Sequence, residues 1–568
     1  MRPLKLTRIF AVAALACLIG ACVPSAAANP SQLQALNPVQ DASATYPVQG
    51  VVLNSLTHQP IPRALVDATT DAALTDGDGH FELNLPAGVT QITTRRPGYI
   101  SDGRSTHAVR VAPEMPGLTF YLSPTATITA RVTLSTGEDA SAISFTVFRR
   151  GSFNGHERWS QQGNAVTNSE GILRIEDIES PASYILCSSP SHDLTTSLPT
   201  SADVTFGFPS ICYPETFSSA ADTSNLSSAN LLNVAPGQQA EVSITLTREP
   251  FYRTSIAVPN HSPAQGVYVQ IRDAGGRPLE YWSHWNPQQG IAQVSLPNGQ
   301  YYAEARSNGA TSSYGRVDFK VANAPISGLS MMLHPLRPLL VHLHRDFTVT
   351  DPQSIAIGNG GSPDGNAGLN LNLANVDSLA GEMGGGLQPA RGATDPNLFQ
   401  VENVVPGRYW VETFPFSGYV TSITSGGVDL ARQPLVIGAG DTAAPIEVTL
   451  RNDGGQIKGT INQPQTSSAA PTPELNTTFI YAIPAFPTTS PLQRTESQNA
   501  LPFVFNNLAP GPYKIVATDK EIDPNDTLQL APYAARGQAV TIQSSGTENL
   551  QLDIVPAFPA SASEGSDQ

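Results

Sequence analysis

The sequence predicts an all-β protein, a tandem array of about five Ig-like β-sandwich domains that follows a signal peptide. Short apolar segments alternate with polar residues at a period of two, and almost no segment shows a helical period. Among 568 residues, 48 are proline and 46 are glycine without a Gly-X-Y period, which indicates frequent turns and not collagen. A turn followed by an aromatic residue also recurs at intervals of roughly 100 residues, the usual size of a sandwich domain.

The clearest domain spans residues 46–124, where about seven short strands are expected between turn residues. Pro60 and Pro62 end the first strand, because proline donates no backbone N–H and fixes φ. Asp76-Gly77-Asp78-Gly79 predicts a tight turn, since glycine accepts positive φ and aspartate bonds its own backbone. Phe81 and Leu83 then alternate with polar residues, as in a half-buried strand.

Five ordered motifs lie in this stretch. They are Val48-x-Gly50, Pro60-Ile61-x-x-Ala64-x-Val66, Thr75-Asp76-x-x-Gly79-x-Phe81, Leu85-Pro86-Ala87-Gly88 and Arg96-Pro97-Gly98-Tyr99. Together they resemble the carboxypeptidase-regulatory-like domain, a transthyretin-like sandwich, over about residues 46–122. The resemblance implies a non-catalytic module with a carbohydrate-binding-like fold, related in shape to starch-binding-like domains.

The Leu85-Pro86-Ala87-Gly88 turn has weaker copies further along the chain. The copies are Leu296-Pro297-Asn298-Gly299-Gln300-Tyr301, Val405-Pro406-Gly407-Arg408-Tyr409, Ala509-Pro510-Gly511-Pro512-Tyr513 and the degenerate Ser180-Pro181-Ala182-Ser183-Tyr184. Each predicts a turn between two strands and an aromatic side chain that fills the core.

These signals divide the chain into consecutive parts. We expect a lipoprotein signal peptide over 1–22, a tether over 23–45, sandwiches over 46–124, 125–249, 250–336, 337–450 and 451–556, and a disordered tail over 557–568. The linkers are very short, which predicts an extended, semi-rigid array. Whether the last four sandwiches share the topology of the first is not evident from the sequence.

The N-terminus has the layout of a bacterial export signal. Three basic residues precede an apolar run over 9–20, shorter than the about 20 residues that span a bilayer. Leu18-Ile19-Gly20-Ala21-Cys22 resembles a lipobox, in which Cys22 becomes the acylated first residue; cleavage after Ala28 is the alternative. Val23 after the cysteine favours the outer membrane by resemblance to lipoprotein sorting. We expect a cell-envelope protein held to the membrane by the lipid alone.

Composition excludes one class of partner. Charged residues are 14% and the net charge is −16, so the chain has no basic surface for nucleic acid. It also contains no GxSxG, HExxH, Walker or strand-borne GxGxxG motif. We therefore expect neither an enzyme nor a cofactor, although a Ser-His-Asp triad is recognised by geometry and not by sequence.

Cys187 and Cys212 lie in the same predicted sandwich and suggest a disulfide in an exported protein. Closing a loop of this length would stabilise the fold by roughly 3 kcal/mol in the chain-entropy model. The alternative is a pair of buried thiols.

An aromatic cluster is the candidate for glycan stacking. Tyr281, Trp282 and Trp285 present flat rings that can stack on sugars, and His156–Trp159 is a weaker relative. On a strand Tyr281 and Trp285 face one side while Trp282 and His284 face the other, so one pair is expected to be core. Ordinary packing is the alternative for all of them.

Two further groups are weak candidates for metal binding. Asp76 and Asp78 lack the additional oxygen ligands that calcium needs, so a plain turn is favoured. His342 and His344 share one face of a strand, but the sequence offers no third ligand. We predict no metal site. The sequence thus favours a non-catalytic lipoprotein that binds polysaccharide, with a spacer or scaffold for an envelope protein as the alternative.

Overall fold

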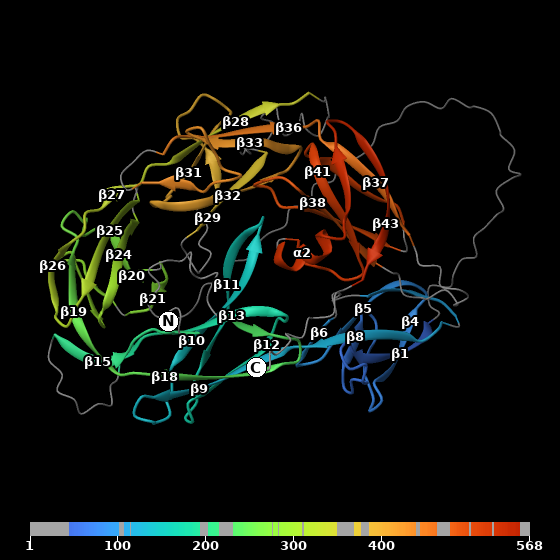
Figure 1. Ribbon diagram of the computed structural model, residues 1–568, viewed down its shortest axis with the longest axis horizontal. Coiled ribbons are helices and arrows are strands. Elements are labelled where there is room, and N and C mark those ends of the chain that lie inside the picture. The colour runs from blue at the N-terminus through green and yellow to red at the C-terminus, as the bar shows by residue number, and fades with distance from the viewer. Residues whose placement is uncertain are drawn as a thin grey trace, which may run out of the picture. The chain divides into compact units, whose positions relative to one another are not determined.

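The computed structural model describes residues 45–101, 107–113, 115–192, 203–214, 231–274, 276–281, 283–308, 312–348, 368–376, 386–438, 443–462, 477–498, 501–524 and 527–556. Strands make up nearly all of the regular structure, so the predicted all-β tandem fold is confirmed (Figure 1). The predicted signal peptide and tail, and nearly all of the tether, lie outside these residues. In the part that is described, no helix is long and apolar enough to cross a membrane.

The five sandwiches share one strand topology. In each, the first strand pairs antiparallel with a middle strand and parallel with the last strand. In chain order these triplets are β1 (Thr45–Asn54), β4 (His80–Pro86) and β8 (Leu118–Pro124); β9 (Ala126–Leu134), β12 (Ile172–Ile178) and β18 (Gln239–Leu246); β19 (Glu249–Ala257), β23 (Ile291–Leu296) and β26 (Ile326–Ser330); β28 (Leu339–Asp346), β31 (Leu398–Val401) and β36 (Ile446–Arg451); and β37 (Gly455–Asn462), β40 (Phe503–Leu508) and β43 (Thr547–Val555). The first strand therefore lies at the centre of its sheet in every repeat.

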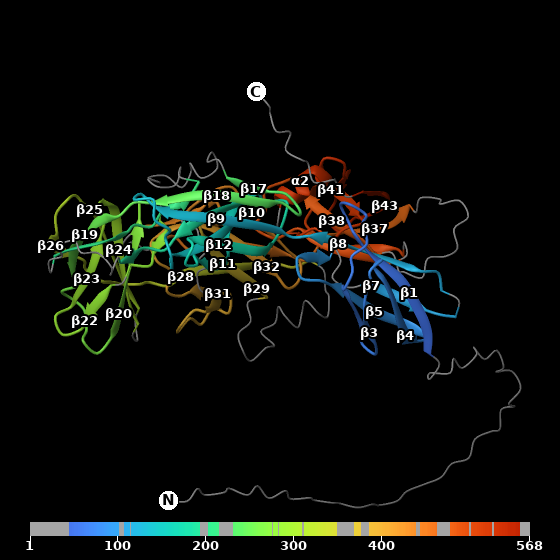
Figure 2. The ribbon, with the colours of Figure 1, turned by 90° about the horizontal axis from the view of Figure 1, so that it is seen from below.

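Each sandwich also contains an antiparallel run of three strands. This run is a separate sheet in the first four sandwiches, whereas in the fifth it is joined to the first sheet by a parallel pairing of Ala517 with Ile554. These runs are β2 (Leu65–Ala68), β5 (Gly88–Arg95) and β7 (His107–Val111); β10 (Ser144–Phe153), β13 (Ala182–Ser188) and β17 (Leu232–Val234); β20 (Gly266–Asp273), β24 (Gly299–Asn308) and β25 (Ser313–Val321); β29 (Leu369–Asn375), β32 (Gly407–Pro415) and β35 (Leu435–Ile437); and β38 (Thr477–Pro484), β41 (Gly511–Thr518) and β42 (Gln538–Ile542). Figure 2 shows strands of both sheets of the first sandwich. The later four sandwiches thus repeat the first.

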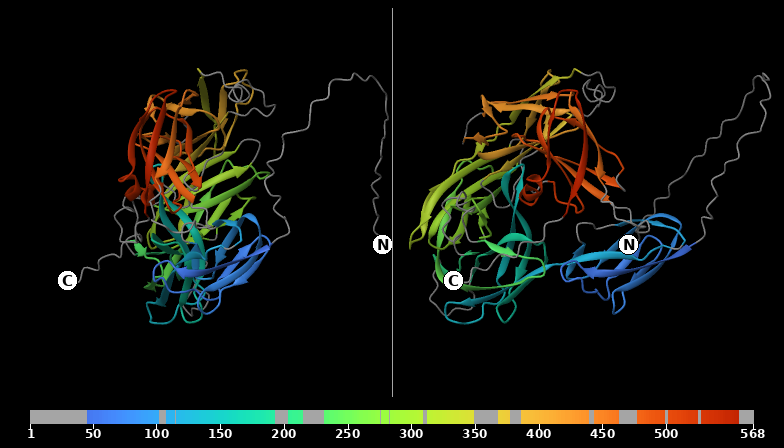
Figure 3. Two further views of the ribbon diagram at one scale, coloured as in Figure 1. Left: turned by 90° about the vertical axis from the view of Figure 1, so that its right-hand side faces the viewer. Right: turned by 45° about the vertical axis from the view of Figure 1, so that its right-hand side comes forward.

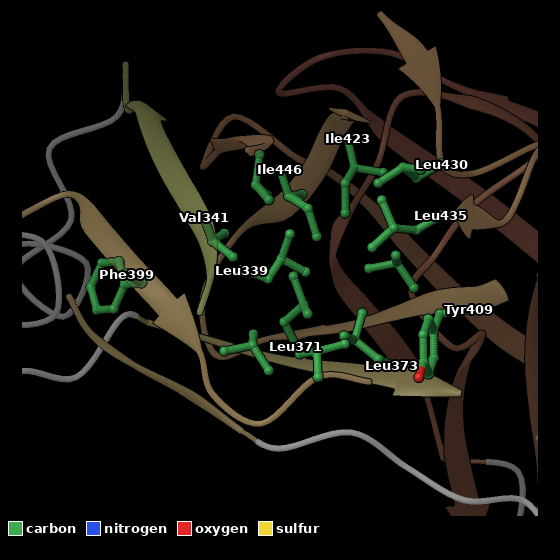
Figure 4. Packing of buried hydrophobic residues seen from close by; sticks show 14 of the residues in the cluster. Leu339, Val341, Leu371, Leu373, Phe399, Tyr409, Ile423, Leu430, Leu435 and Ile446 are labelled. Carbon is green, nitrogen blue, oxygen red and sulfur yellow. The ribbon is translucent and has the colours of Figure 1, made fainter. Parts of the chain in front are cut away.

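Alternating side chains build one core in each sandwich. Along β8 the buried residues Leu118, Phe120 and Leu122 alternate with outward-facing ones, as a pleated strand requires. In the fourth sandwich, Leu339 of β28 and Leu371 of β29 meet in the core between the two sheets (Figure 4). The period-two pattern of the sequence therefore sets the inner face of each sheet.

The recurring turn has a structural explanation. Tyr301, Tyr409 and Tyr513 are buried, and each hydroxyl donates a hydrogen bond to the backbone carbonyl four residues earlier, at 2.8–3.2 Å. Tyr184 does the same to the carbonyl of Glu179 at 2.6 Å. The aromatic ring fills the core, and its hydroxyl closes the turn that precedes the strand.

A glycine beneath a phenylalanine ring is repeated in the first and last sandwiches. A Cβ at Gly50 would lie 2.6 Å from both the Phe81 ring and the carbonyl oxygen of Leu118. Gly459 is placed in the same way against Phe503 and the carbonyl of Leu550. In both sandwiches only glycine lets the ring lie across the first strand.

The first sandwich also explains its Thr75-Asp76 motif. The buried hydroxyl of Thr75 donates to the carbonyl of Ile61 at 2.7 Å and accepts from the backbone N–H of Ala64 at 2.8 Å. One carboxylate oxygen of Asp76 accepts from the N–H groups of Asp78 and His80. This is the plain turn favoured above, with the aspartate occupied by its own backbone.

One segment of the second predicted domain adds strands to the third sandwich. β14 (Ser191–His192) and β15 (Val204–Phe208) belong to the sheet of β19, and β15 pairs antiparallel with it. The chain then returns to the second sandwich at β16 (Cys212–Tyr213), which pairs with β13. The predicted boundary at residue 249 therefore does not separate the two sandwiches completely, because residues before it belong to a sheet of the third sandwich.

The one helix among the described residues, α2 (Thr527–Ala534), lies in the fifth sandwich. Leu530 of α2 is buried in a small cluster with Phe479 and Tyr481 of β38. The helix also contacts β10 of the second sandwich.

Candidate functional site

A β-hairpin of the second sandwich forms the candidate site. It consists of β10 and β11 (His156–Val166), joined by Asn154 and Gly155 at φ values of 49° and 82°. Positive φ at both central residues is typical of a two-residue type I′ hairpin, and Asn-Gly is its preferred sequence. The tight turn lets the tip (residues 153–159) extend beside strands of the fourth and fifth sandwiches (Figure 3).

Aromatic contacts hold this tip against the fourth sandwich. The imidazole of His156 stacks on the indole of Trp410 in β32, with ring centroids 3.5 Å apart and planes inclined by 12°. Phe153 lies 6.4 Å from Phe414 between ring centroids. We call this junction of the tip with β32 and the fifth sandwich the clasp.

Polar contacts complete the clasp. Arg158 donates from Nη1 to Oε1 of Glu412 at 3.2 Å, and the two side chains are 29% and 7% exposed. Asn154 donates from Nδ2 to the backbone carbonyl of Thr489 in the fifth sandwich at 3.2 Å. Three sandwiches therefore meet at one point. The expected extended array is wrong, because side chains 254 and 335 residues apart in sequence are in contact.

Burial shifts two titratable groups of the clasp in opposite directions. Burial lowers the pKa of the His156 imidazole, which favours its neutral form. Burial raises the pKa of the Glu412 carboxyl, and the guanidinium of Arg158 offsets part of that rise. Both shifts make uncharged forms easier to hold in the clasp.

The space beneath the hairpin is small. Its cavity of about 70 Å³ is lined by two indoles, Trp159 and Trp410, with polar groups that include Asn375 and Glu412. Pockets that hold drug-sized ligands measure about 300–1,000 Å³. The side chains of the clasp thus fill this junction almost completely.

The predicted disulfide is confirmed, and the predicted lipidation site is not described. Cys187 and Cys212 are bonded directly across β13 and β16. Both sulfurs belong to a small buried cluster that also contains Trp159 of the hairpin. Cys22 lies outside the described residues.

The glycan-stacking prediction is wrong for Tyr281. This ring is buried in the core of the third sandwich, against Phe251 and Tyr301, so a sugar has no access to it. Trp285 is half-buried, packs on the same core and meets His261 edge-on at 5.4 Å. Trp282 lies outside the described residues. The prediction that Tyr281 and Trp285 share one face of a strand is also wrong, because the strand that contains Trp285 spans only His284–Asn286 and Tyr281 precedes it.

The histidine pair has a neighbour that sequence reasoning missed. Glu447 of β36 lies between the two imidazoles, with its oxygens 3.7 Å from Nδ1 of His342 and 2.7 Å from Nε2 of His344. β36 pairs parallel with β28 a hundred residues earlier, so no local pattern reveals this contact. Among the described residues, no group of three His, Cys, Asp or Glu side chains is arranged to hold a metal ion.

The partners of the hairpin were also missed. Trp410 and Glu412 lie two positions apart on β32, and in the sequence they look like part of an ordinary strand after the turn before Tyr409. The only local signal was the run His156–Trp159, whose mixture of rings and opposite charges is unusual for a hairpin end.

Comparisons with known proteins give no family. No family model matches the chain, and no curated protein matches it. Among solved structures, the Bacillus anthracis TIE protein has 9% identity and a TM-score of 0.13, over 91% of this chain and 69% of that chain. The shaft pilin SpaA from Lactobacillus rhamnosus GG has 9% identity and a TM-score of 0.20, over 36% and 98%. A streptococcal ancillary pilin has 8% identity and a TM-score of 0.17, over 51% and 100%. Likenesses at these scores support no conclusion about this chain.

Proposed function

We propose that this chain is a non-catalytic scaffold of the bacterial cell envelope, in which tandem β-sandwiches are held in a fixed arrangement to present surfaces to an envelope protein. The observation that carries the proposal is the clasp. The second sandwich reaches the fourth through an aromatic stack and an ion pair, and reaches the fifth through a hydrogen bond. A rigid arrangement of domains is what a scaffold requires and what a flexible tether would lack.

The loss of predicted ligand-binding residues supports the same proposal. Tyr281 is core, Trp285 packs on the core, and the His156–Trp159 run is occupied by contacts within the chain. The aromatic rings that suggested sugar binding therefore serve packing, wherever they are described. These contacts favour the scaffold hypothesis over the hypothesis of a polysaccharide-binding module.

Polysaccharide binding is the second candidate, and the lining of the clasp favours it. Indole rings beside amide, carboxylate and guanidinium groups are the kind of surface on which sugars stack and form hydrogen bonds. The cavity of about 70 Å³ is too small for a ring, so the hairpin would have to withdraw first. This candidate thus requires a conformational change that the scaffold does not.

Two parts of the proposal rest on the sequence alone. Cys22 is proposed as the lipid-bearing residue that places the protein in the envelope, with the outer membrane as its location. The first sandwich is proposed to be a carboxypeptidase-regulatory-like module, which accords with the roles of Gly50, Phe81 and Thr75 in its fold. Replacing Cys22 with alanine should release the protein into the soluble fraction, and unchanged membrane association would contradict the anchor.

Cross-linking in cells tests the scaffold. The wild-type chain should give a discrete cross-linked adduct with an envelope protein, and Trp410→Ala should weaken it by opening the clasp. Tyr268→Ala is the control, because it removes an exposed ring from a sheet that contains none of the strands of the clasp. Absence of any adduct, together with retention of the wild-type chain on immobilised polysaccharide, would replace the scaffold with the second candidate.

A further inference from the structure

A segment of the second sandwich crosses into the third and returns. We call its described residues, 188–192 and 203–211, the strap. Its strand β15 extends the sheet of the third sandwich beyond β19, whereas both of its ends, β13 and β16, belong to the second sandwich. The strap therefore completes a sheet that the residues of the third sandwich leave open.

The strap contacts the third sandwich through a short strand pairing and through side chains, among them Asp203, whose carboxylate lies 3.8 Å from the guanidinium of Arg253. Val204 to Gly207 pair with Tyr252 to Glu249, and the backbone N–H of Arg253 donates to the carbonyl of Asp203 at 2.9 Å. Ser189 donates from its hydroxyl to Glu280 at 2.9 Å. The pairing of β15 with β19 spans four residues, which is near the lower end of the usual strand length of roughly 3–10 residues.

The disulfide lies where the two ends of the strap come together. Cys187 and Cys212 face each other across β13 and β16, and β16 is only two residues long. From the third sandwich, the guanidinium of Arg277 contacts Sγ of Cys212 and pairs with Asp273 at 3.0 Å. The bridge thus joins both ends of the strap at the surface on which the third sandwich rests.

We propose that the disulfide is the lock of the strap, so that breaking it releases β15 from the third sandwich and exposes the edge of β19. While the disulfide is closed, the ends of the strap cannot separate. The formation of the short β15 pairing then costs less conformational entropy, because the loop that carries it is already closed. Once it is open, the returning end is held only by non-covalent contacts. These include the two-residue pairing of β16 and hydrogen bonds between Ser188 and Ile211, at 2.7 Å from the N–H of Ser188 to the carbonyl of Ile211 and at 2.9 Å from the N–H of Ile211 to the hydroxyl of Ser188. The second and third sandwiches then lose their shared sheet.

The opening reaction is a thiol–disulfide exchange with an external dithiol. The S–S bond accepts two electrons and two protons and gives two cysteine thiols, while the dithiol becomes a cyclic disulfide. Both cysteines are nearly inaccessible, at 4% and 2% exposure, so the exchange is slow in the closed state. The bridge therefore acts as a durable lock and not as a rapid sensor.

Hydrogen exchange on the full chain tests the lock. The protein is compared oxidised, reduced with dithiothreitol and as Cys187→Ser/Cys212→Ser, with free thiols counted by alkylation and mass. We expect the amides of Glu249–Arg253, the half of β19 that pairs with β15, to exchange at least tenfold faster without the bridge, whereas Thr254–Ala257 stay paired with β26 and β23. Amides of Ala126–Leu134, at the centre of the other sheet of the second sandwich, should keep their protection.

Two results would overturn the proposal. Unchanged protection of Glu249–Arg253 in the thiol form would show that the β15 pairing persists without the disulfide. Equal loss of protection in Ala126–Leu134 would show that the bridge stabilises the second sandwich as a whole and has no particular role at the strap. The double-serine variant separates these results from incomplete reduction, since it has no bridge at any time.

Discussion

Removing Arg158 should loosen the clasp through the carboxylate it leaves behind. Glu412 has a side-chain exposure of only 7%, so Arg158→Gln leaves this charge buried without its partner. Breaking a fully buried ion pair costs about 3–5 kcal/mol, and a hydrogen bond to a charged group contributes about 1.5–3 kcal/mol. Because Arg158 is itself 29% exposed, we expect the lower range, about 2 kcal/mol, or roughly 30-fold more opening.

Hydrogen exchange at the hairpin tip measures this opening directly. The amides of residues 150–160 should exchange roughly 30-fold faster in Arg158→Gln, while amides of β37 stay unchanged. Arg150→Gln is the matched control, because Arg150 pairs at 2.7 Å with Glu157 inside the hairpin and not with a residue of the fourth or fifth sandwich.

A double-mutant cycle decides whether the pair itself is responsible. Arg158→Gln/Glu412→Gln should open less than the sum of the two single variants, because no buried charge remains unpaired. Additive effects, or equal effects of Arg158→Gln and Arg150→Gln, would refute the reasoning. Global unfolding is a poorer assay here, since a chain of five sandwiches is not expected to unfold in two states.

Three other perturbations have defined outcomes. In Glu412→Gln the clasp should be most stable above pH 6.5 and weaken below it. The reason is that burial lowers the pKa of His156, so the open state takes up a proton at a higher pH than the closed state. In His156→Gln the clasp should instead weaken as pH rises above 4.5, because burial raises the pKa of Glu412 and the open state loses its proton at a lower pH than the closed state. Amide exchange rates of the hairpin tip, measured as a function of pH, should therefore change in opposite directions in the two variants. Identical pH profiles would contradict both predictions. Gly459→Ala should destabilise the fifth sandwich by about 1–3 kcal/mol through overlap with the Phe503 ring, whereas Gly266→Ala, with open space around it, should be near neutral for the third sandwich, each measured by amide hydrogen exchange in its own sandwich. Tyr409→Phe should cost the fourth sandwich about 1 kcal/mol, since the carbonyl of Val405 loses its donor, and unchanged amide exchange in β32 would argue against a role for the hydroxyl.

Local chemistry explains why so much of the fold could be predicted. Period-two alternation gave the strands, and Pro-Gly turns before Tyr301, Tyr409 and Tyr513 gave the repeat, because these features need only residues close in sequence. The pairing of Cys187 with Cys212 was also predictable, since they are the only cysteines after Cys22.

The burial of the aromatic residues was not predictable from alternation. Alternation assumed one strand through Tyr281 and Trp285, whereas the strand spans only His284–Asn286, and both rings pack on the core from separate segments. The burial of Tyr281 depends on Phe251 and Tyr301, which come from other strands of the third sandwich. The misassigned glycan site follows from this limit.

The sequence by itself determined the repeated sandwich, its turns and its disulfide, because each is specified by residues within one domain. Only the tertiary structure decided that His156 stacks on Trp410, that Arg158 meets Glu412 and that β15 joins the sheet of β19. Such contacts depend on how separate sandwiches pack together. The residues near a side chain in the sequence do not indicate a contact with a residue hundreds of positions away. The candidate site is therefore a property of the assembled chain, whereas the fold is a property of its repeats.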